Sequence, residues 1–161
     1  MKPLQLLALS SLAVCLCARA EIPSEKYLPL SVSTEIASAT VKACTAKGYN
    51  VTAAVVDRAG GVRVVMRADK AGPHTLDSAR RKAYTSASTK RSTSEILENV
   101  QKNPASQHLP MIDGFLILGG GVPIKVGDEV IGAVGVGGAP GGHLDEQCAN
   151  AGLEAVKDQL K

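Results

Sequence analysis

A hairpin signature in the C-terminal half sets the tightest limit on the fold of this chain. Two runs rich in valine and isoleucine are separated only by Gly127-Asp128, a connection typical of a β-hairpin. A second pair of such runs flanks the turn at residues 58–61. Strands joined this closely are antiparallel. The hairpin strands that we expect are residues 51–57, 61–67, 122–126 and 129–136.

Helical patterns surround the two hairpins. Ser92 and Glu95 form a capping-box pattern, in which the serine and the glutamate each bond the other's backbone N–H. Small and apolar residues recur at helical spacing in the other segments. The helices that we expect are residues 32–47, 75–89, 92–102 and 144–159, and residues 114–118 read as a further strand. The predicted fold is α+β, an antiparallel sheet with the helices covering one face.

The first twenty residues have the pattern of a cleavable signal peptide. Lys2 supplies a positive charge, residues 4–17 are apolar, and Ala18-Arg19-Ala20 fits the small-x-small cleavage rule. About 14 apolar residues are too few to span a bilayer, which takes roughly 20. We therefore predict a leader over residues 1–20 and a single domain over residues 21–161. The mature protein would be periplasmic or secreted, with no membrane insertion after cleavage.

Charge and aromatic content limit the partners of this domain. Cleavage would remove Lys2 and Arg19 and no acidic residue, which lowers the formal net charge from +3 to +1. A nearly neutral exported protein has no electrostatic attraction for nucleic acid or anionic membranes, and we expect neither as a partner. The chain has three tyrosines, one phenylalanine and no tryptophan. The small side chains that remain bury little area each, which favours a homo-oligomer.

Two cysteines, Cys44 and Cys148, remain after the predicted cleavage. Each lies on an expected helix, near one end of the chain. An oxidising compartment permits a disulfide between them. Buried free thiols are the alternative, and we expect them here because the sequence does not give the distance between the two helices.

Five short motifs, in order along the chain, resemble those of the GlcG/HbpS family of haem-binding proteins. They are Val55–Gly61 (V-V-D-x-x-G-x), Lys82–Ser86 (K-A-x-T-A), Gly120–Ile124 (G-G-V-P-I/L), Val130–Gly138 (V-x-G-A-I-G-V-S-G) and Asp145–Ala149 (D-E-x-C-A). The resemblance covers residues 30–160. It implies a profilin-like α+β fold, assembly into homo-oligomers and non-covalent binding of haem.

The histidines are the candidate haem ligands, because the chain lacks the Cys-x-x-Cys-His motif of covalent attachment. His74 lies at the start of an expected helix, where backbone N–H groups favour an anionic group such as a propionate. His108 lies in a loop with Met111, a second possible soft ligand. His74 and His108 are therefore the candidate metal ligands. His143 opens the last helix, and a solvent-exposed capping role is our expectation for it.

A carboxylate or a haem propionate has further candidate partners on the helix 75–89. Arg81 and Tyr84 share one face of this helix with Asp77, and arginine binds carboxylates well. Gly120 and Gly121 lie in a glycine turn whose N–H groups could face an anion, although a turn with positive φ is the simpler interpretation. The sequence has no nucleophile elbow or metal signature.

The function that we expect is an exported haem-binding or haem-scavenging accessory protein. The alternatives are a binding module, or a cofactor-independent enzyme, for a small organic acid such as a hydroxy acid, and an assembly protein whose oligomer is its function. A binding protein is favoured over an enzyme, because no catalytic motif is present.

Overall fold

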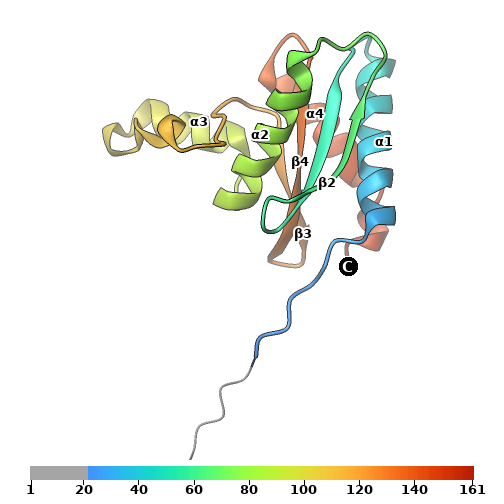
Figure 1. Cartoon of the computed structure of the whole chain (residues 1–161), viewed down its shortest axis with the longest axis horizontal. Helices are drawn as coiled ribbons and strands as arrows, with labels where there is room; N and C mark the ends of the chain where they lie inside the picture. The colour runs from blue at the N-terminus through green and yellow to red at the C-terminus, as the bar shows by residue number, and fades with distance from the viewer. Residues whose placement is uncertain (1–21) are drawn as a thin grey trace, which may run out of the picture.

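Four strands form an antiparallel sheet at the centre of residues 22–161, the part of the chain that this computed structural model describes. They are β1 (Thr52–Asp57), β2 (Val62–Arg67), β3 (Gly121–Val126) and β4 (Glu129–Gly137). Their order is β2-β1-β4-β3 (Figure 1), so β1 and β4 join the two hairpins at the centre. Both predicted hairpins are confirmed. The predicted leader, residues 1–20, lies outside the described residues.

Four α-helices and three short 3₁₀ turns accompany the sheet. They are α1 (Leu30–Ala46), α2 (His74–Thr89), α3 (Thr93–Lys102), η1 (Pro104–Ser106), η2 (Leu109–Met111), α4 (Gly142–Glu154) and η3 (Lys157–Gln159). The capping box of α3 forms as predicted, with Ser92 and Glu95 bonding each other's backbone N–H. The last helix is shorter than predicted and continues only as η3. Within residues 22–161, no helix is both long enough and apolar enough to cross a membrane.

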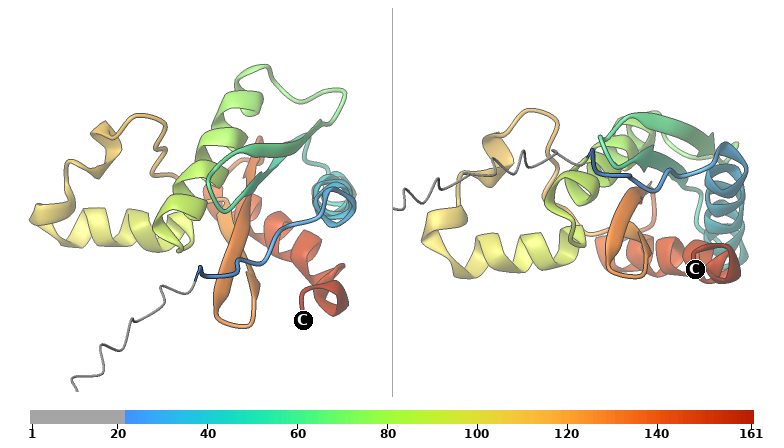
Figure 2. Two further views of the ribbon diagram at one scale, coloured as in Figure 1. Left: turned by 60° about the horizontal axis from the view of Figure 1, so that its bottom comes forward. Right: turned by 90° about the horizontal axis from the view of Figure 1, so that it is seen from below.

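Helices cover both faces of the sheet, so the prediction that they cover one face is wrong. On one face, α1 and α4 pack around a core that contains Ile36, Val55 and Val134. On the other face, α2 packs against Val56 and Ala133 (Figures 1 and 2). The physical reason lies in β1 and β4. Both strands are buried along nearly their whole length, so both faces of the sheet must be covered there.

Glycines of β4 bring α2 unusually close to the sheet. A Cβ atom on Gly135 would overlap the carbonyl oxygen of Ala79, and one on Gly137 would overlap the hydroxyl of Ser78. The facing side of α2 carries Ala79 and Ala83, both fully buried. Small residues on both elements therefore replace the large side chains that a wider interface would need.

The predicted strand at residues 114–118 is wrong. The structure places these residues in an irregular segment beside α2. Their backbone groups bond to side chains of that helix: the hydroxyl of Thr85 accepts from the N–H of Leu116 at 2.9 Å, and Arg81 donates to the carbonyl of Phe115. Because side chains of α2 bond these two backbone groups, neither group needs a neighbouring strand as its hydrogen-bond partner.

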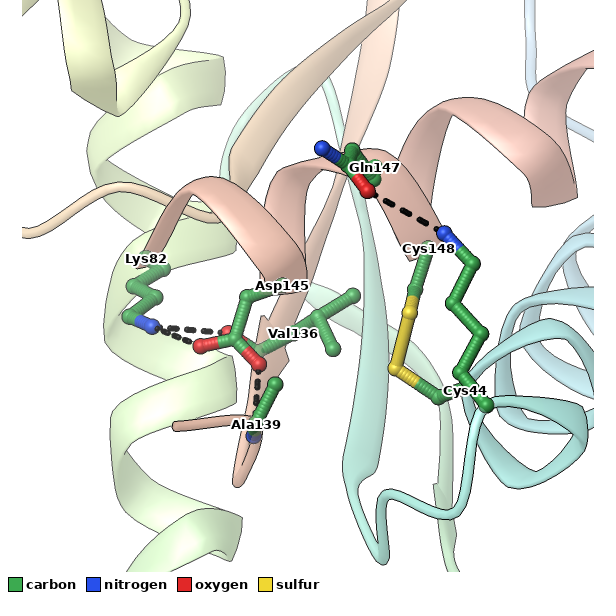
Figure 3. The surroundings of a disulfide bond; sticks show 8 residues. Cys44, Lys82, Val136, Ala139, Asp145, Gln147 and Cys148 are labelled. Carbon is green, nitrogen blue, oxygen red and sulfur yellow. Dashed lines mark hydrogen bonds and ion pairs between the residues drawn. A yellow bond between two sulfur atoms is a disulfide. The ribbon is translucent and has the colours of Figure 1, made fainter. Parts of the chain in front are cut away.

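A disulfide joins Cys44 of α1 to Cys148 of α4, which corrects the expectation of free thiols (Figure 3). Both cysteines are fully buried and their Cα atoms lie 5.4 Å apart. The crossing of α1 and α4 brings them together across a sequence separation of 104 residues. The bond therefore ties the first helix of the described chain to the last one.

Candidate functional site

A buried ion pair connects α2 to the first turns of α4. The Nζ atom of Lys82 lies 2.7 Å from Oδ2 of Asp145, and the two side chains are 2% and 4% exposed (Figure 3). Lys82 also donates to the carbonyl of Val136 at 2.9 Å, and Asp145 accepts from the N–H of Ala139 at 3.0 Å. Both charges are therefore hydrogen-bonded as well as paired, which burial requires.

Burial raises the pKa of Asp145 above its ordinary value, because desolvation disfavours the carboxylate. The positive charge of Lys82 and its hydrogen bond act in the opposite direction, and the N–H of Ala139 adds to them. Desolvation is the largest of these effects.

Gly120 and Gly121 pack around this ion pair. Gly120 has a φ of 118°, and a Cβ there would lie 2.7 Å from Cβ of Asp145 and 3.1 Å from Nζ of Lys82. The N–H of Gly121 donates to the hydroxyl of Thr93 at 2.8 Å. Both glycines are buried. Gly120 thus has the positive φ of the simpler interpretation made from the sequence, whereas Gly121 begins β3.

A pocket of about 490 Å³ lies between α3, the segment before β3 and α4. We call it the α3–α4 pocket. Its lining comprises Ser94, Leu97, Leu118, Gly119, Gly142, His143, Glu146, Gln147 and Asn150. Its volume falls in the range of small-molecule sites, about 300–1,000 Å³. The leucines supply apolar walls, and the polar groups come from α4 and from Ser94 of α3.

Close contact between two glycines fixes the edge of this pocket. A Cβ on Gly142 would lie 2.7 Å from the carbonyl oxygen of Gly119, and a Cβ on Gly119 would lie 3.2 Å from the carbonyl carbon of Gly142. Asp145, in the same part of α4, is held by Lys82 and Ala139. The α4 wall of the pocket is therefore anchored to the body of the protein.

Glu146, a half-buried residue, brings an unsatisfied carboxylate oxygen to the pocket. Its Oε2 atom is buried and has no hydrogen-bond partner among residues 22–161. An unpaired buried carboxylate oxygen is costly, and such atoms in folded proteins usually have a functional or solvent-related explanation. A ligand that supplies a hydrogen-bond donor or a positive charge would satisfy it.

His143 lines the α3–α4 pocket and is exposed to solvent, so its ring is accessible to a ligand. The sequence analysis predicts an exposed capping residue here: the exposure is confirmed, whereas the N-cap of α4 is Gly141 and His143 lies within the helix. Its place beside the pocket was missed. The pocket forms only where α3 and residues 118–119 fold against α4. These segments are far apart in the sequence, so no local pattern predicts their contact.

His74 lies in a different and smaller pocket, of about 300 Å³, where it is joined by Tyr49, Asn50 and Lys70. His108 is exposed between η1 and η2, where its ring contacts the side chain of Gln107 at 3.2 Å. Neither His108 nor Met111 lines the pocket of His74. The structure thus does not bring the two predicted metal ligands into one pocket.

Met111 follows His108 in η2 and is 77% exposed. Figure 2 shows that α3 and the segment with η1 and η2 project from the sheet as an arm. We use the term arm for residues 93–118. No cluster of three or more histidine, cysteine or acidic residues suited to a metal occurs within residues 22–161.

Arg81 and Tyr84 hold the arm to α2. Arg81 donates to the carbonyl of Phe115, and its guanidinium lies 3.9 Å from the carboxylate of Asp77. The ring of Tyr84 packs edge-on against Phe115, with 6.1 Å between the ring centroids. Arg81 thus contacts a backbone carbonyl of the arm and an acidic side chain of its own helix.

Lys82 and Asp145 are the site residues that sequence reasoning missed, although a signal for Lys82 existed. Ala79, Lys82, Ala83, Ser86 and Ala87 recur at the spacing of one helix face, and all are buried. A lysine on such a stripe of small residues indicates a buried charge that needs a partner. The partner itself, 63 residues away, has no local signal.

Solved structures of similar fold were found for most of the chain. A double mutant of Streptomyces reticuli HbpS is 39% identical, with a TM-score of 0.79 over 91% of this chain and 99% of that one. Klebsiella pneumoniae ORFY is 29% identical, with a TM-score of 0.81 over 87% and 98%. The PduOC:heme complex is 22% identical, with a TM-score of 0.72 over 81% and 95%, and shares the fold.

A family model provides the assignment that the motifs suggested. The model described as haem degrading protein HbpS-like matches residues 28–154, which include all four strands and all four α-helices. The fold agrees, since the sheet and its helices match those of HbpS and ORFY. The chain therefore belongs to the HbpS-like family of haem degrading proteins.

Proposed function

We propose that this protein binds haem in the α3–α4 pocket and that it does so outside the cytoplasm. The observation that carries the proposal is the match of residues 28–154 to a family described as haem degrading. The PduOC:heme complex supports it, because that protein carries haem on the same fold.

The residues of the α3–α4 pocket fit a haem. Leu97 and Leu118 offer apolar surface to the macrocycle, and His143 is a histidine at the same pocket that could ligate iron. Haem, when bound, supplies an iron centre that takes part in oxygen and electron-transfer chemistry. The protein's part is to hold the macrocycle against the two leucines and to present His143.

Export is the second half of the proposal. The pattern of residues 1–20 supports it, and so does the Cys44–Cys148 disulfide, because structural disulfides persist in oxidising compartments. Expression of the full chain in a Gram-negative host, followed by mass spectrometry of the periplasmic fraction, tests it. A mature protein that begins at Glu21 is the expected result, and an uncleaved chain in the cytoplasm would refute it.

Association between copies of this chain is part of the same proposal. Met111, Ile112 and Leu118 expose large apolar surface on the arm, which projects from the sheet. Apolar surface grouped on one projecting segment is typical of an interaction site. Light scattering of the purified protein measures its oligomeric state, and a monomer at micromolar concentration would refute this part.

Titration of apo-protein with hemin tests haem binding directly. We expect a saturable Soret band for the wild type and a weaker, shifted band for His143→Ala. His74→Ala and His108→Ala are the matched controls, since neither residue lines the α3–α4 pocket, and both should behave like the wild type. The absence of a saturable band at micromolar wild-type protein would overturn the proposal. An unchanged band in His143→Ala would overturn the choice of ligand.

A further inference from the structure

The charge distribution around the α3–α4 pocket is unbalanced. Among residues 22–161, Glu146 is the only one with a carboxylate that lines the pocket, and no lysine or arginine lines it. Lys47 reaches one lining residue, Gln147, at 3.1 Å from its amide oxygen. Within residues 22–161, Glu146 has no ion-pair partner within 4.0 Å.

The adjacent acidic residue shows the contrast. Asp145 is paired with Lys82 and accepts from the N–H of Ala139, so its charge adds little to the field in the pocket. Glu146, the next residue along α4, has a buried Oε2 atom with no such partner in the part of the chain that the structure describes. Its negative charge therefore acts on whatever occupies the pocket, and a ligand that covers Leu97 and Leu118 strengthens that effect by displacing water.

We infer that Glu146 is a specificity-determining residue of this pocket, and that its carboxylate selects a flat apolar ligand with a positively charged centre. The inference rests on the proposed function. For haem it means a preference for the ferric form, whose iron–porphyrin core carries one positive charge, over the ferrous form, whose core is neutral. The same carboxylate opposes the approach of an anionic group to this wall of the pocket.

Two porphyrins that differ in core charge test this inference without redox chemistry. Gallium(III) and zinc(II) protoporphyrin share the macrocycle and the propionates, but the gallium core carries one positive charge more. Fluorescence titration gives a dissociation constant for each. The quantity to compare between variants is the ratio of the two constants, because differences in axial ligation between the metals are common to all variants.

Glu146→Gln removes the charge and keeps the size of the side chain. We expect it to reduce the preference for gallium over zinc on the order of tenfold. Glu146→Asp keeps the charge and should keep most of the preference. Glu154→Gln is the matched control: it removes a charge from the same helix, about 12 Å further along, where Glu154 is paired with Lys157 outside the pocket.

The reduction potential of the haem-loaded protein gives a second readout. A tenfold loss of ferric preference corresponds to about 59 mV for one electron, so the midpoint of Glu146→Gln should be higher by about that amount. Glu154→Gln should leave it unchanged.

The outcomes separate the inference from the proposed function. If the wild type binds neither porphyrin nor hemin, the proposed function falls and the inference falls with it. If all variants bind and Glu146→Gln keeps the wild-type ratio and midpoint, only the role of Glu146 is overturned. A change in Glu146→Gln that is absent from Glu146→Asp and Glu154→Gln supports it.

Discussion

Lys82 and Asp145 form an ion pair of 2.7 Å between Nζ and Oδ2 that is almost completely removed from solvent. Each residue lies in one of the motifs that resemble those of the HbpS-like family. The pair joins α2 on one face of the sheet to α4 on the other face. The path between the two helices runs past the end of β4, where Lys82 bonds the carbonyl of Val136. The pair thus fixes the beginning of α4, and with it one wall of the α3–α4 pocket.

Removing one partner of this pair should be much worse than removing both. Lys82→Met leaves the Asp145 carboxylate buried without its cation, and we expect a loss of about 3–5 kcal/mol in the free energy of unfolding. The double variant Lys82→Met/Asp145→Asn keeps an acceptor for the N–H of Ala139 and removes both charges, so it should be more stable than Lys82→Met alone. Urea unfolding measures both. Additive losses in the double variant would contradict this coupling.

The stability that depends on Asp145 should decrease as the pH rises. Because burial raises the pKa of Asp145, the folded state binds a proton more readily than the unfolded state does. The contribution is therefore complete below the ordinary pKa of 3.8 and is lost as the pH rises through the raised value. Urea unfolding between about pH 3.5 and 8 should show the wild type losing stability relative to Lys82→Met/Asp145→Asn. A gain in the stability of the wild type relative to the double variant over that range would mean that Lys82 lowers the pKa of Asp145 more than burial raises it.

Reduction of the disulfide should destabilise the protein without unfolding the sheet hairpins. The bond closes a loop across 104 residues, and loss of a native disulfide costs about 2–5 kcal/mol. Thermal unfolding with and without reductant measures the effect. Cys44→Ala/Cys148→Ala is the control, because reductant should then have no effect. Equal stability of the oxidised and reduced wild type would contradict the prediction.

Gly135→Ala should be more damaging than a glycine substitution that creates only backbone strain. A Cβ at position 135 would overlap the carbonyl oxygen of Ala79 and press α2 off the sheet, at a cost of about 3 kcal/mol. Gly48 has a φ of 82° and open space around its Cβ position, so Gly48→Ala should cost about 1 kcal/mol. Denaturant unfolding of both variants compares them, and an equal loss would refute the close packing of α2 on β4.

The sequence predicted the elements whose signals are local. The Gly127-Asp128 turn and the Ser92–Glu95 capping box involve residues at most three apart, and both are present in the structure. Residues 114–118 have the composition of a strand, but their backbone is bonded by Thr85 and Arg81, about thirty residues earlier in the chain. Contacts of that kind are settled by tertiary packing and have no local pattern.

The candidate site was predictable only in part. The family resemblance pointed to the motifs that contain Lys82 and Asp145, but not to their pairing, and the pocket beside Glu146 depends on three segments that meet only in the folded protein. The disulfide is a similar case, because the approach of Cys44 and Cys148 is set by the crossing of α1 and α4. A site that is formed by segments far apart in the sequence can be identified only from the three-dimensional structure.

The two walls of the α3–α4 pocket differ in how firmly they are held to the body of the protein. One wall is α4, which carries the buried Asp145 and is linked covalently to α1, whereas the other belongs to the arm, with Leu97 on α3 and Leu118 at the end of the arm. A ligand that fills the pocket therefore joins the arm to the body. Amide hydrogen exchange is expected to slow in α3 when the pocket is filled and to change little in α4, so the arm reports occupancy.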